Sequence, residues 1–334
     1  MNFNFLCDRR ILITGGTGLI GYNLVVKILE FPVSKIFVTG RSMKKLTTTF
    51  GQFANDERLV LVEHEVSEVV PSTIHDIDLI FHAAGPMERN IVLNYPVSVV
   101  LPNVLGTINL LNFLKDEKER RGRKGRIIIF SSVTVYANSS DKDITVREFD
   151  TSDAISLDAQ TACYAESKRM SEIIAKSYGK QYGIDAVIAR FSTVYGYTKN
   201  IPDTAFFEFI KKAVRGENIV LNGNGFPCRD NIYIDDAING LLILAEMGVC
   251  GEAYNISSGG DLNNFAAVDE IAQAISEQSA LVLGKPAVEV ILGGKTPRKP
   301  GICLENSKLK KLGWNVKTSL VKGINETIHK ILNL

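Results

Sequence analysis

The stretch Ile11-Leu-Ile-Thr-Gly-Gly-Thr-Gly-Leu-Ile-Gly21 decides the fold of this 334-residue chain. Three apolar residues typical of a buried strand lead into a glycine turn, and apolar residues then recur at helical spacing from Leu24 to Leu29. This order predicts a dinucleotide site, because the glycines let the backbone approach a pyrophosphate and the helix start supplies N–H groups and a positive dipole. A tight turn without a ligand is the alternative. The cofactor-binding residues predicted here are Gly15, Thr17, Gly18, Leu19, Ile20 and Gly21.

Outward from this turn, short β-rich runs alternate with segments of helical period, which predicts parallel βαβ units. The expected fold class is α/β, a Rossmann-type doubly wound parallel sheet with a smaller C-terminal α/β substrate lobe. Residues 1–190 should form the dinucleotide-binding domain, joined by later segments near 229–258, and residues 191–334 mainly the substrate-binding lobe. Strands are expected at 10–14, 35–39, 58–63, 78–82, 126–131, 185–190 and 253–256, and helices at 21–30, 98–116 and 161–182.

The overall composition argues for small-molecule partners. The formal net charge is +1, which disfavours a nucleic-acid or membrane surface. The mixed-sign run 115–126 is interpreted as a solvated loop. Five scattered cysteines indicate neither a disulfide framework nor a zinc site. The lone histidines His64, His75 and His329 are expected at the surface, and no metal site is predicted. The sequence indicates neither an export signal nor a membrane span, so a cytoplasmic location is expected.

The end of the second expected strand bears on the choice between NAD and NADP. A carboxylate there would bind the ribose 2′-hydroxyl and repel a 2′-phosphate, but the sequence has Arg41 and Ser42 at this point. A cation and a hydroxyl favour NADP, with NAD possible if Arg41 is only a solvated charge. The ends of the third and fourth strands should also face the cofactor. They contribute Glu65, Val66, Ala83, Ala84 and Gly85.

Tyr164 and Lys168 are four residues apart among good helix formers, so both side chains should project from one helix face. Lowering the pKa of a tyrosine from about 10 to about 7 needs roughly 4 kcal/mol, which an adjacent ammonium and a nicotinamide cation could supply together. Tyr164 would then act as a base, and Lys168 would also bind the nicotinamide ribose. Tyr195 and Lys199 share the spacing, but Gly196 suggests a loop there.

Ser132 ends the strand expected at 126–131, at the edge where open α/β sheets bind ligands. Serines after a strand are commonly turn formers. Together with the glycine turn and the Tyr164–Lys168 pair, however, Ser132 is predicted to hydrogen-bond the reacting hydroxyl, which makes it both a catalytic and a substrate-binding residue.

Taken together, these motifs resemble the extended short-chain dehydrogenase/reductase family, in its NAD(P)-dependent nucleotide-sugar epimerase/dehydratase branch. The resemblance implies a nucleotide diphosphate sugar as substrate, a homodimer built from helices such as 98–116 and 161–182, and Ser132, Tyr164 and Lys168 as the catalytic triad. It also implies cofactor contact by Asn103 and diphosphate contact by Arg229 and Arg298. The motifs that carry it are 14–21, His82-Ala-Ala-Gly85, Asn103-Val-Leu-Gly-Thr107, 131–136, Tyr164-x-x-x-Lys168, 229–236 and Leu312-Gly-Trp314.

Departures from the family pattern narrow the reaction. Val133-Thr134 replaces the Asp-Glu pair of the dehydratases, which disfavours dehydration, and Thr193 stands where the family has a substrate-contacting Asn. The leading hypothesis is an NDP-sugar 4-epimerase acting through a transient keto sugar. An NADPH-dependent NDP-keto-sugar reductase is the main alternative, and a decarboxylase or dehydratase of the family and a non-catalytic dinucleotide sensor are further ones.

Overall fold

A parallel sheet organises the computed structural model, which describes residues 3–137, 142–150, 155–221, 227–294 and 300–333. Within these ranges the sheet has 7 strands, and every neighbouring pair is parallel. This confirms the predicted fold class. In spatial order the strands are β3 (Leu59–Glu63), β2 (Lys35–Gly40), β1 (Arg10–Thr14), β4 (Leu79–His82), β5 (Arg126–Ser132), β7 (Asp185–Phe191) and β11 (Ala253–Ile256).

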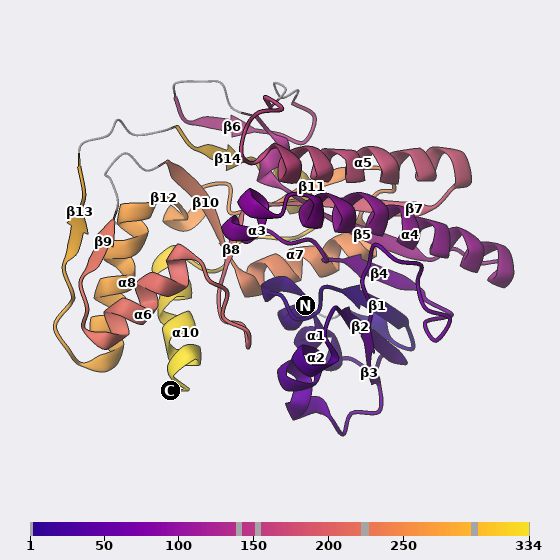
Figure 1. Cartoon of the computed structure of the whole chain (residues 1–334), viewed down its shortest axis with the longest axis horizontal. Helices are drawn as coiled ribbons and strands as arrows, with labels where there is room; N and C mark the ends of the chain where they lie inside the picture. The colour runs from indigo at the N-terminus through magenta and orange to yellow at the C-terminus, as the bar shows by residue number, and fades with distance from the viewer. Residues whose placement is uncertain (1–2, 138–141, 151–154, 222–226, 295–299, 334) are drawn as a thin grey trace.

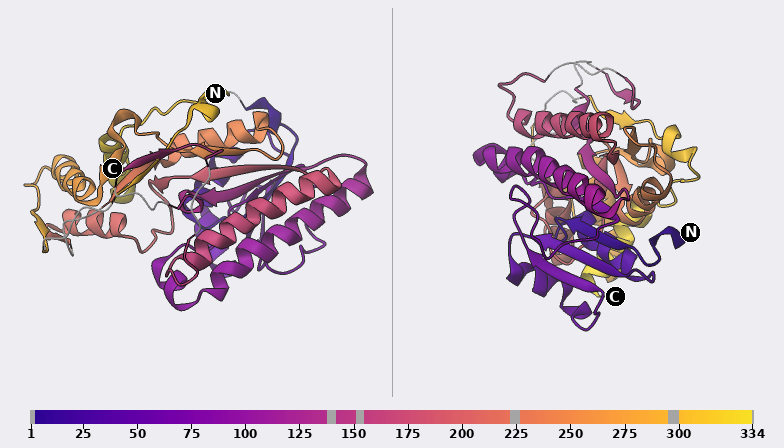
Figure 2. Two further views of the ribbon diagram at one scale, coloured as in Figure 1. Left: turned by 90° about the horizontal axis from the view of Figure 1, so that it is seen from above. Right: turned by 90° about the vertical axis from the view of Figure 1, so that its right-hand side faces the viewer.

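Helices cover both faces of this sheet, as the left view of Figure 2 shows. Successive residues of β1 point to opposite faces, so Ile11 and Ile13 belong to one buried cluster and Leu12 to another. The first cluster is covered by α1 (Leu19–Leu29) and α7 (Ile234–Met247), and the second by α4 (Val97–Arg121) and α5 (Ala162–Tyr182). Near-continuous apolar runs such as Ile127 to Phe130 are what a strand buried on both faces requires.

The strand order fixes where a ligand can bind. The chain moves outward from β1 through β2 to β3, then returns to place β4 on the other side of β1. The loops that follow β1 and β4 therefore diverge and leave a crevice at the carboxyl ends of these strands, which is the usual ligand position in open α/β sheets.

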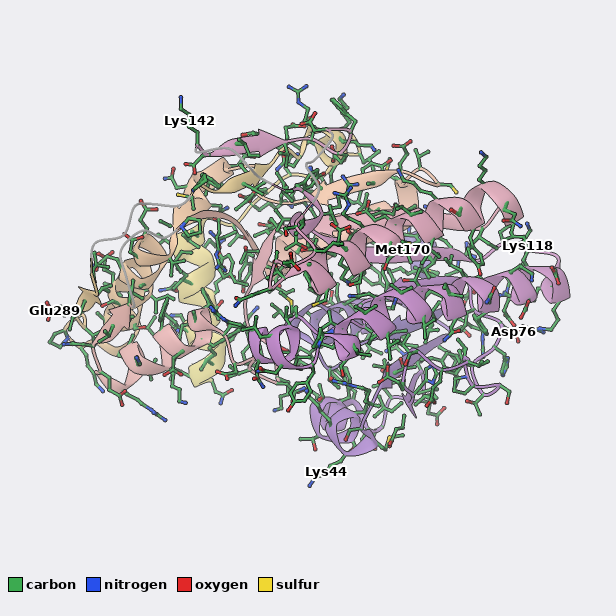
Figure 3. The ribbon with its side chains drawn as sticks, turned by 45° about the horizontal axis from the view of Figure 1, so that its top comes forward. Lys44, Asp76, Lys118, Lys142, Met170 and Glu289 are labelled. Atoms are coloured by element: carbon green, nitrogen blue, oxygen red, sulfur yellow. The ribbon has the colours of Figure 1, made fainter. Side chains whose placement is uncertain are left out.

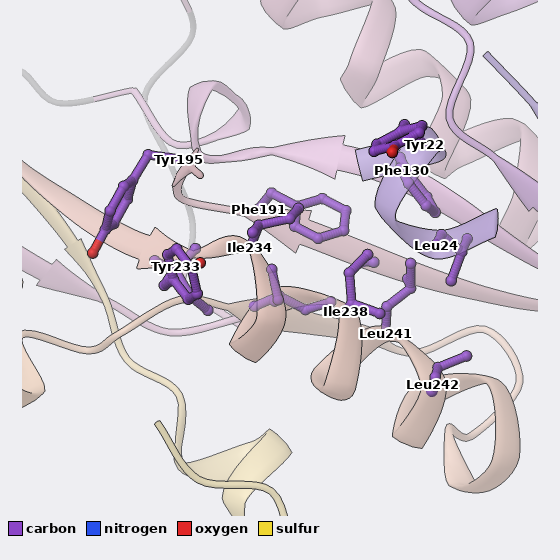
Figure 4. Packing of buried hydrophobic residues seen from close by; sticks show 14 of the residues in the cluster. Tyr22, Leu24, Phe130, Phe191, Tyr195, Tyr233, Ile234, Ile238, Leu241 and Leu242 are labelled. Atoms are coloured by element: carbon purple, nitrogen blue, oxygen red, sulfur yellow. The ribbon is translucent and has the colours of Figure 1, made fainter. Parts of the chain in front are cut away.

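The C-terminal lobe contains a smaller mixed sheet and shares its core with the first. Tyr233 at the end of β10 and Phe191 at the end of β7 belong to one continuous cluster (Figure 4). Trp314 is fully buried, and its indole donates a 3.0 Å hydrogen bond to the carbonyl of Asp236 in α7. The elements of this lobe, seen on the left of Figure 1, are β8 (Thr193–Tyr195), α6 (Ala205–Arg215), β9 (Ile219–Leu221), β10 (Cys228–Tyr233), η4 (Asp261–Asn263), β12 (Phe265–Ala267), α8 (Val268–Leu283), β13 (Val290–Leu292), β14 (Ile302–Leu304), α9 (Ser307–Lys310) and α10 (Leu320–Leu332).

Of the remaining short elements, β6 (Ile144–Val146) belongs to the smaller sheet and the others flank the large one. β6 pairs with β14 and so extends the smaller sheet. These elements are η1 (Asn4–Leu6), α2 (Met43–Phe50), η2 (Gly51–Phe53), α3 (Arg89–Asn94), η3 (Val133–Val135) and β6 (Ile144–Val146).

Helix α4 overturns one sequence expectation. It continues to Arg121, so the first half of the run expected as a solvated loop, 115–126, is helical. The Arg121 side chain is only 7% exposed, and it donates a 2.7 Å hydrogen bond to Asp78 and lies 3.5 Å from Glu117. The solvated-loop interpretation was therefore wrong for this part of the run, because these charges neutralise one another inside the fold. By length and composition α4 would also suit a membrane span, but many of its apolar residues pack against the sheet.

Replacing Arg121 with Met should lower the free energy of unfolding by about 3 kcal/mol, because the buried carboxylates of Asp78 and Glu117 lose the buried cation that they share. Arg123 also pairs with Asp78, at 3.0 Å, but it is exposed. Arg123→Ala should therefore cost less than about 1 kcal/mol. Urea denaturation of both variants measures the difference, and equal losses would contradict the buried pairing.

Candidate active site

The glycine turn after β1 is too closely packed for side chains. Gly15 has φ +67°, and a Cβ atom built on it would lie 2.8 Å from the Ala84 backbone. A Cβ on Gly21 would lie 2.4 Å from the Gly15 carbonyl oxygen. Helix α1 starts directly after Gly18, so the N–H groups of Leu19 and Ile20 have no partner inside the helix. This arrangement suits a pyrophosphate, and it puts the turn beside the Ala83-Ala84-Gly85 segment as the sequence predicts.

A buried hydrogen-bonded chain ties the turn to the end of β4. The Thr14 hydroxyl accepts a 3.2 Å hydrogen bond from the Ala84 N–H and lies 2.9 Å from Nδ1 of His82. Burial, together with the nearby charge of Lys168, lowers the pKa of His82 to about 3, so the ring is neutral. Its other nitrogen bonds the Pro102 carbonyl in α4. His82, the last residue of β4, therefore links this strand to β1 and to α4.

Ser132, Tyr164 and Lys168 lie together at the carboxyl ends of the central strands. The Ser132 hydroxyl is hydrogen-bonded to the Tyr164 phenol, and the Lys168 ammonium lies 5.9 Å from the centre of the Tyr164 ring. Lys168 Nζ also donates a 2.8 Å hydrogen bond to the Phe130 carbonyl. Helix α5 supplies the last two side chains one turn apart, and β5 supplies the serine.

Asn103 and Gly85 place this cluster against the dinucleotide crevice. A Cβ on Gly85 would lie 2.5 Å from Asn103 Oδ1 and 3.2 Å from Lys168 Nζ. Asn103 is buried, and its amide donates a 2.9 Å hydrogen bond to Ser167. Its Oδ1 has no hydrogen-bond partner among the described residues. A buried acceptor left open beside a glycine and an ammonium fits a polar ligand such as a nicotinamide ribose.

The electrostatics of the phenol differ from the sequence expectation. Burial raises the pKa of Tyr164 above its ordinary value, and the hydrogen bond with Ser132 is the contribution that lowers it. We expected Lys168 to be the group that lowers it. Burial also lowers the pKa of Lys168 to about 8, against an opposing effect of Glu172. Desolvation is therefore the largest influence on the pKa of both groups.

A buried ion pair behind the cluster was not found from the sequence. Both carboxylate oxygens of Glu172 accept hydrogen bonds from the Arg190 guanidinium, at 2.9 and 2.6 Å. Glu172 also accepts a hydrogen bond from Ser131, the neighbour of Ser132, at 2.5 Å. The pair therefore fixes the end of β5 relative to α5. The one signal in the sequence is the four-residue spacing of Lys168 and Glu172, which puts both on one face of a helix.

At the end of β2, Arg41 pairs with Glu65, a predicted cofactor residue, and this pairing was not predicted from the sequence. Arg41 is exposed, and its Nε lies 3.9 Å from a carboxylate oxygen of Glu65, which follows β3. The Ser42 hydroxyl accepts a hydrogen bond from Lys45 and caps α2, while Val66 is buried against Gly106. Because Glu65 balances the guanidinium, the argument for a 2′-phosphate at Arg41 is weakened.

Two of the four predicted substrate residues lie on the smaller sheet, whereas Ser132 ends β5 of the large sheet. Thr193 begins β8 and pairs with Asn231 of β10, and Arg229 stands on β10 opposite Ala266. Arg298 lies outside the described residues.

His64 is not at the surface as we expected. It follows β3 and is buried, and burial lowers its pKa. In the part of the chain that the structure describes, no group of three His, Cys, Asp or Glu side chains could hold a metal ion.

Comparison with known proteins identifies the family to which the chain belongs. The model of the NAD dependent epimerase/dehydratase family matches residues 11–257. The chain belongs to this family. That confirms the resemblance inferred from the sequence motifs.

Several members of the family are similar over almost the whole chain. UDP-glucuronic acid decarboxylase 6 of Arabidopsis thaliana is 32% identical over 96% of this chain and 88% of its own length. The human dTDP-D-glucose 4,6-dehydratase is 26% identical over 96% of this chain and 89% of its own length.

Solved structures of the family superpose closely. The UDP-glucuronic acid 4-epimerase of Bacillus cereus, solved with NAD, has a TM-score of 0.77 at 25% identity, covering 97% of this chain and 99% of that one. WbmF of Bordetella bronchiseptica, solved with NAD+ and UDP, also has a TM-score of 0.77, at 24% identity, covering 99% of this chain and 94% of that one. The fold is therefore that of the nucleotide-sugar enzymes.

Replacing Lys168 with Met should stabilise the cofactor-free protein at pH 7. The pKa of Lys168 is about 8 in the folded protein, against an ordinary value of 10.5, so folding disfavours its charged form by about 3 kcal/mol below pH 8. This penalty fades as pH rises from 8 to 10.5, because the folded protein has then already released the proton. The variant's advantage of up to about 3 kcal/mol should shrink over the same window.

The measurement is the free energy of unfolding of both proteins as a function of pH. Lys176, exposed on the same helix, gives the matched control Lys176→Met, which should show no such advantage. A Lys168→Met protein that is less stable than the wild type at pH 7 would contradict the assignment of a buried, destabilised ammonium.

Proposed function

We propose that this protein is an NAD-dependent enzyme that oxidises C4 of a nucleotide-linked hexuronic acid and restores the hydride within the same site. The observation that carries the proposal is the clustering of Ser132, Tyr164 and Lys168, whose ammonium lies beside Gly85 and Asn103. A sensor that only binds dinucleotide would need the glycine turn but not this cluster.

The described residues fit a nicotinamide dinucleotide. The turn from Gly15 to Gly21, with Thr17 inside it, would hold the pyrophosphate, and Asn103 and Lys168 would hold the nicotinamide ribose. When bound, the dinucleotide supplies the acceptor and donor of the C4 hydride. We propose NAD rather than NADP, because Glu65 lies beside Arg41 and because the relatives solved with a cofactor carry NAD.

Tyr164, Ser132 and Lys168 are proposed to have different roles in the proton transfer. Tyr164 takes the proton of the C4 hydroxyl as the C4–H hydride leaves, which gives a 4-keto sugar, and returns the proton when the hydride comes back. Ser132 hydrogen-bonds the phenol and is placed to hold the sugar oxygen. Lys168 supplies the positive charge that favours the phenolate, and it carries that charge below pH 8.

Epimerisation is the outcome that we favour for the keto sugar. Val133 and Thr134 directly follow Ser132, so neither position offers the carboxylate base that dehydration would need. In a 4-epimerase the keto sugar turns and receives the hydride on its other face. Thr193 and Arg229, with Arg298 from outside the described residues, are proposed to hold the nucleotide diphosphate sugar.

Decarboxylation is the second candidate, favoured by the Arabidopsis decarboxylase at 32% identity. A 4-keto hexuronic acid is a β-keto acid and can lose CO₂ without an added base. Both reactions therefore share their first step and the substrate named in the Arabidopsis and B. cereus relatives, UDP-glucuronic acid. They differ in whether the carboxylate is lost and in whether the keto sugar turns before the hydride returns.

Incubation with UDP-glucuronic acid and NAD separates the candidates. The epimerase predicts UDP-galacturonic acid with no CO₂, and the decarboxylase predicts a UDP-pentose with one CO₂ per turnover. Chromatography that separates the two epimers, mass spectrometry for the UDP-pentose, and trapping of CO₂ distinguish them. Tyr164→Phe should lower kcat by about 10³-fold while cofactor binding remains. In a separate incubation with NADPH and an NDP-keto sugar, net consumption of NADPH would instead indicate the keto-sugar reductase.

We also propose that two copies of the chain pair through α4 and α5, in a reducing cytoplasm that suits the five free cysteines. Val97, Leu101 and Leu105 form an exposed apolar stripe at four-residue spacing along α4. Met170 and Ile173 extend it onto the neighbouring α5, and Figure 3 shows Met170 on the outside of that helix. A second copy is the occupant that buries the same stripe on both partners.

Leu101→Glu should weaken this dimer by more than tenfold, because association would bury a charge without a partner. Light scattering during gel filtration over a range of protein concentrations measures the change. Met247 is an exposed apolar residue at the end of α7 and gives the control Met247→Glu, which should leave the dimer intact. A wild-type protein that stays monomeric at high concentration would refute the pairing.

A further inference from the structure

Residues 196–200 leave the C-terminal lobe after β8 and cross to the glycine turn, where they contact its main chain. We propose that this segment, which we call the strap, retains the bound dinucleotide: Asn200 fastens the glycine turn, and Thr198 offers its hydroxyl to the cofactor. The inference rests on the proposed function only in requiring that a dinucleotide binds at the turn. Figure 1 shows the loop after β8 descending toward α1.

The strap is firmly fixed where it begins. The ring of Tyr195 packs against those of Tyr233 and Phe206, with centroids 5.7 and 5.2 Å apart. Gly196 follows with φ +142°, and a Cβ on it would lie 2.4 Å from Cγ2 of Ile234. Glycine is therefore required at the point where the chain turns out of the lobe.

The strap is fixed a second time on the dinucleotide-binding side. The Asn200 amide donates hydrogen bonds to the Thr17 carbonyl at 3.2 Å and to the Thr49 hydroxyl at 2.7 Å. In the opposite direction, the Asn23 amide of α1 donates a 2.9 Å hydrogen bond to the Tyr197 carbonyl. Thr17 is part of the glycine turn, so Asn200 holds the same backbone whose N–H groups would face a pyrophosphate.

Between these two contacts in the sequence, Thr198 carries a hydroxyl without a hydrogen-bond partner among the described residues. Thr198 is fully buried. A buried hydroxyl without a partner destabilises a protein, so such groups usually meet a ligand or an ordered water. Valine has the same shape without the hydroxyl, so Thr198→Val removes the oxygen and keeps the packing.

The strap has a chemical consequence for a redox-neutral reaction. An enzyme that removes and returns the same hydride must keep its cofactor until the second transfer is complete. A strap that ties the turn to the lobe makes loss of the dinucleotide depend on breaking contacts on both sides. It also links the turn to β8, which carries the proposed substrate residue Thr193.

The test is the rate at which bound NADH leaves the full-length protein. The protein is loaded with NADH and mixed with excess NAD, and the loss of bound NADH fluorescence is followed by stopped flow. Asn200→Ala should accelerate release about tenfold, because two hydrogen bonds are lost, and Thr198→Val about fivefold. Lys199→Ala, an exposed neighbour in the strap, is the matched control and should release NADH at the wild-type rate.

Melting temperatures of the cofactor-free proteins separate retention from folding. We expect Thr198→Val to melt no lower than the wild type, since an unpartnered hydroxyl is removed. If Asn200→Ala releases NADH no faster than the control Lys199→Ala, the role given to Asn200 is wrong. The same result for Thr198→Val would overturn the role given to Thr198. A wild-type protein that takes up no dinucleotide would instead defeat the proposed function, so the two failures are distinguishable.

Discussion

A single ammonium group is held inside the fold at the meeting point of the sheet, the long helix α5 and the dinucleotide crevice. Lys168 is only 6% exposed, and its ammonium is hydrogen-bonded to the Phe130 carbonyl. Keeping a charge in such a place opposes folding, and the surrounding structure has to overcome that opposition. The Glu172–Arg190 pair behind it makes the end of β5 and the start of α5 rigid, so that Ser132, Tyr164 and Lys168 keep their relative positions. The chemistry proposed for this protein depends on that rigidity.

The positions of the residues proposed for the cofactor side could be predicted because their signals are local. The turn from Gly15 to Gly21 and the helical spacing of Tyr164 and Lys168 are each contained in a few consecutive residues, and the structure brings the two together. Strand positions followed from apolar runs that are buried on both faces. Local patterns of this kind need no knowledge of the three-dimensional contacts.

The features that sequence reasoning missed all depend on contacts between distant segments. Glu65 reaches Arg41 from the next strand, which changes the balance between the two cofactors. The Arg121 side chain is charged yet buried, because Asp78 lies 43 residues away in sequence but in contact in space. The direction of the Tyr164 pKa shift was also missed, since spacing reveals a neighbouring charge but not how deeply the phenol is buried. Asn200 was seen only as part of a loop.

The large sheet is completed late in the chain. Its edge strand β11 ends at Ile256 and pairs with β7, after the chain has already built β8, α6 and β10 of the other lobe. A ribosome must therefore make about three-quarters of the protein before the dinucleotide-binding half can close its sheet. Until then the edge of β7 stays open to incorrect pairing, and the nascent chain needs protection from aggregation over that interval.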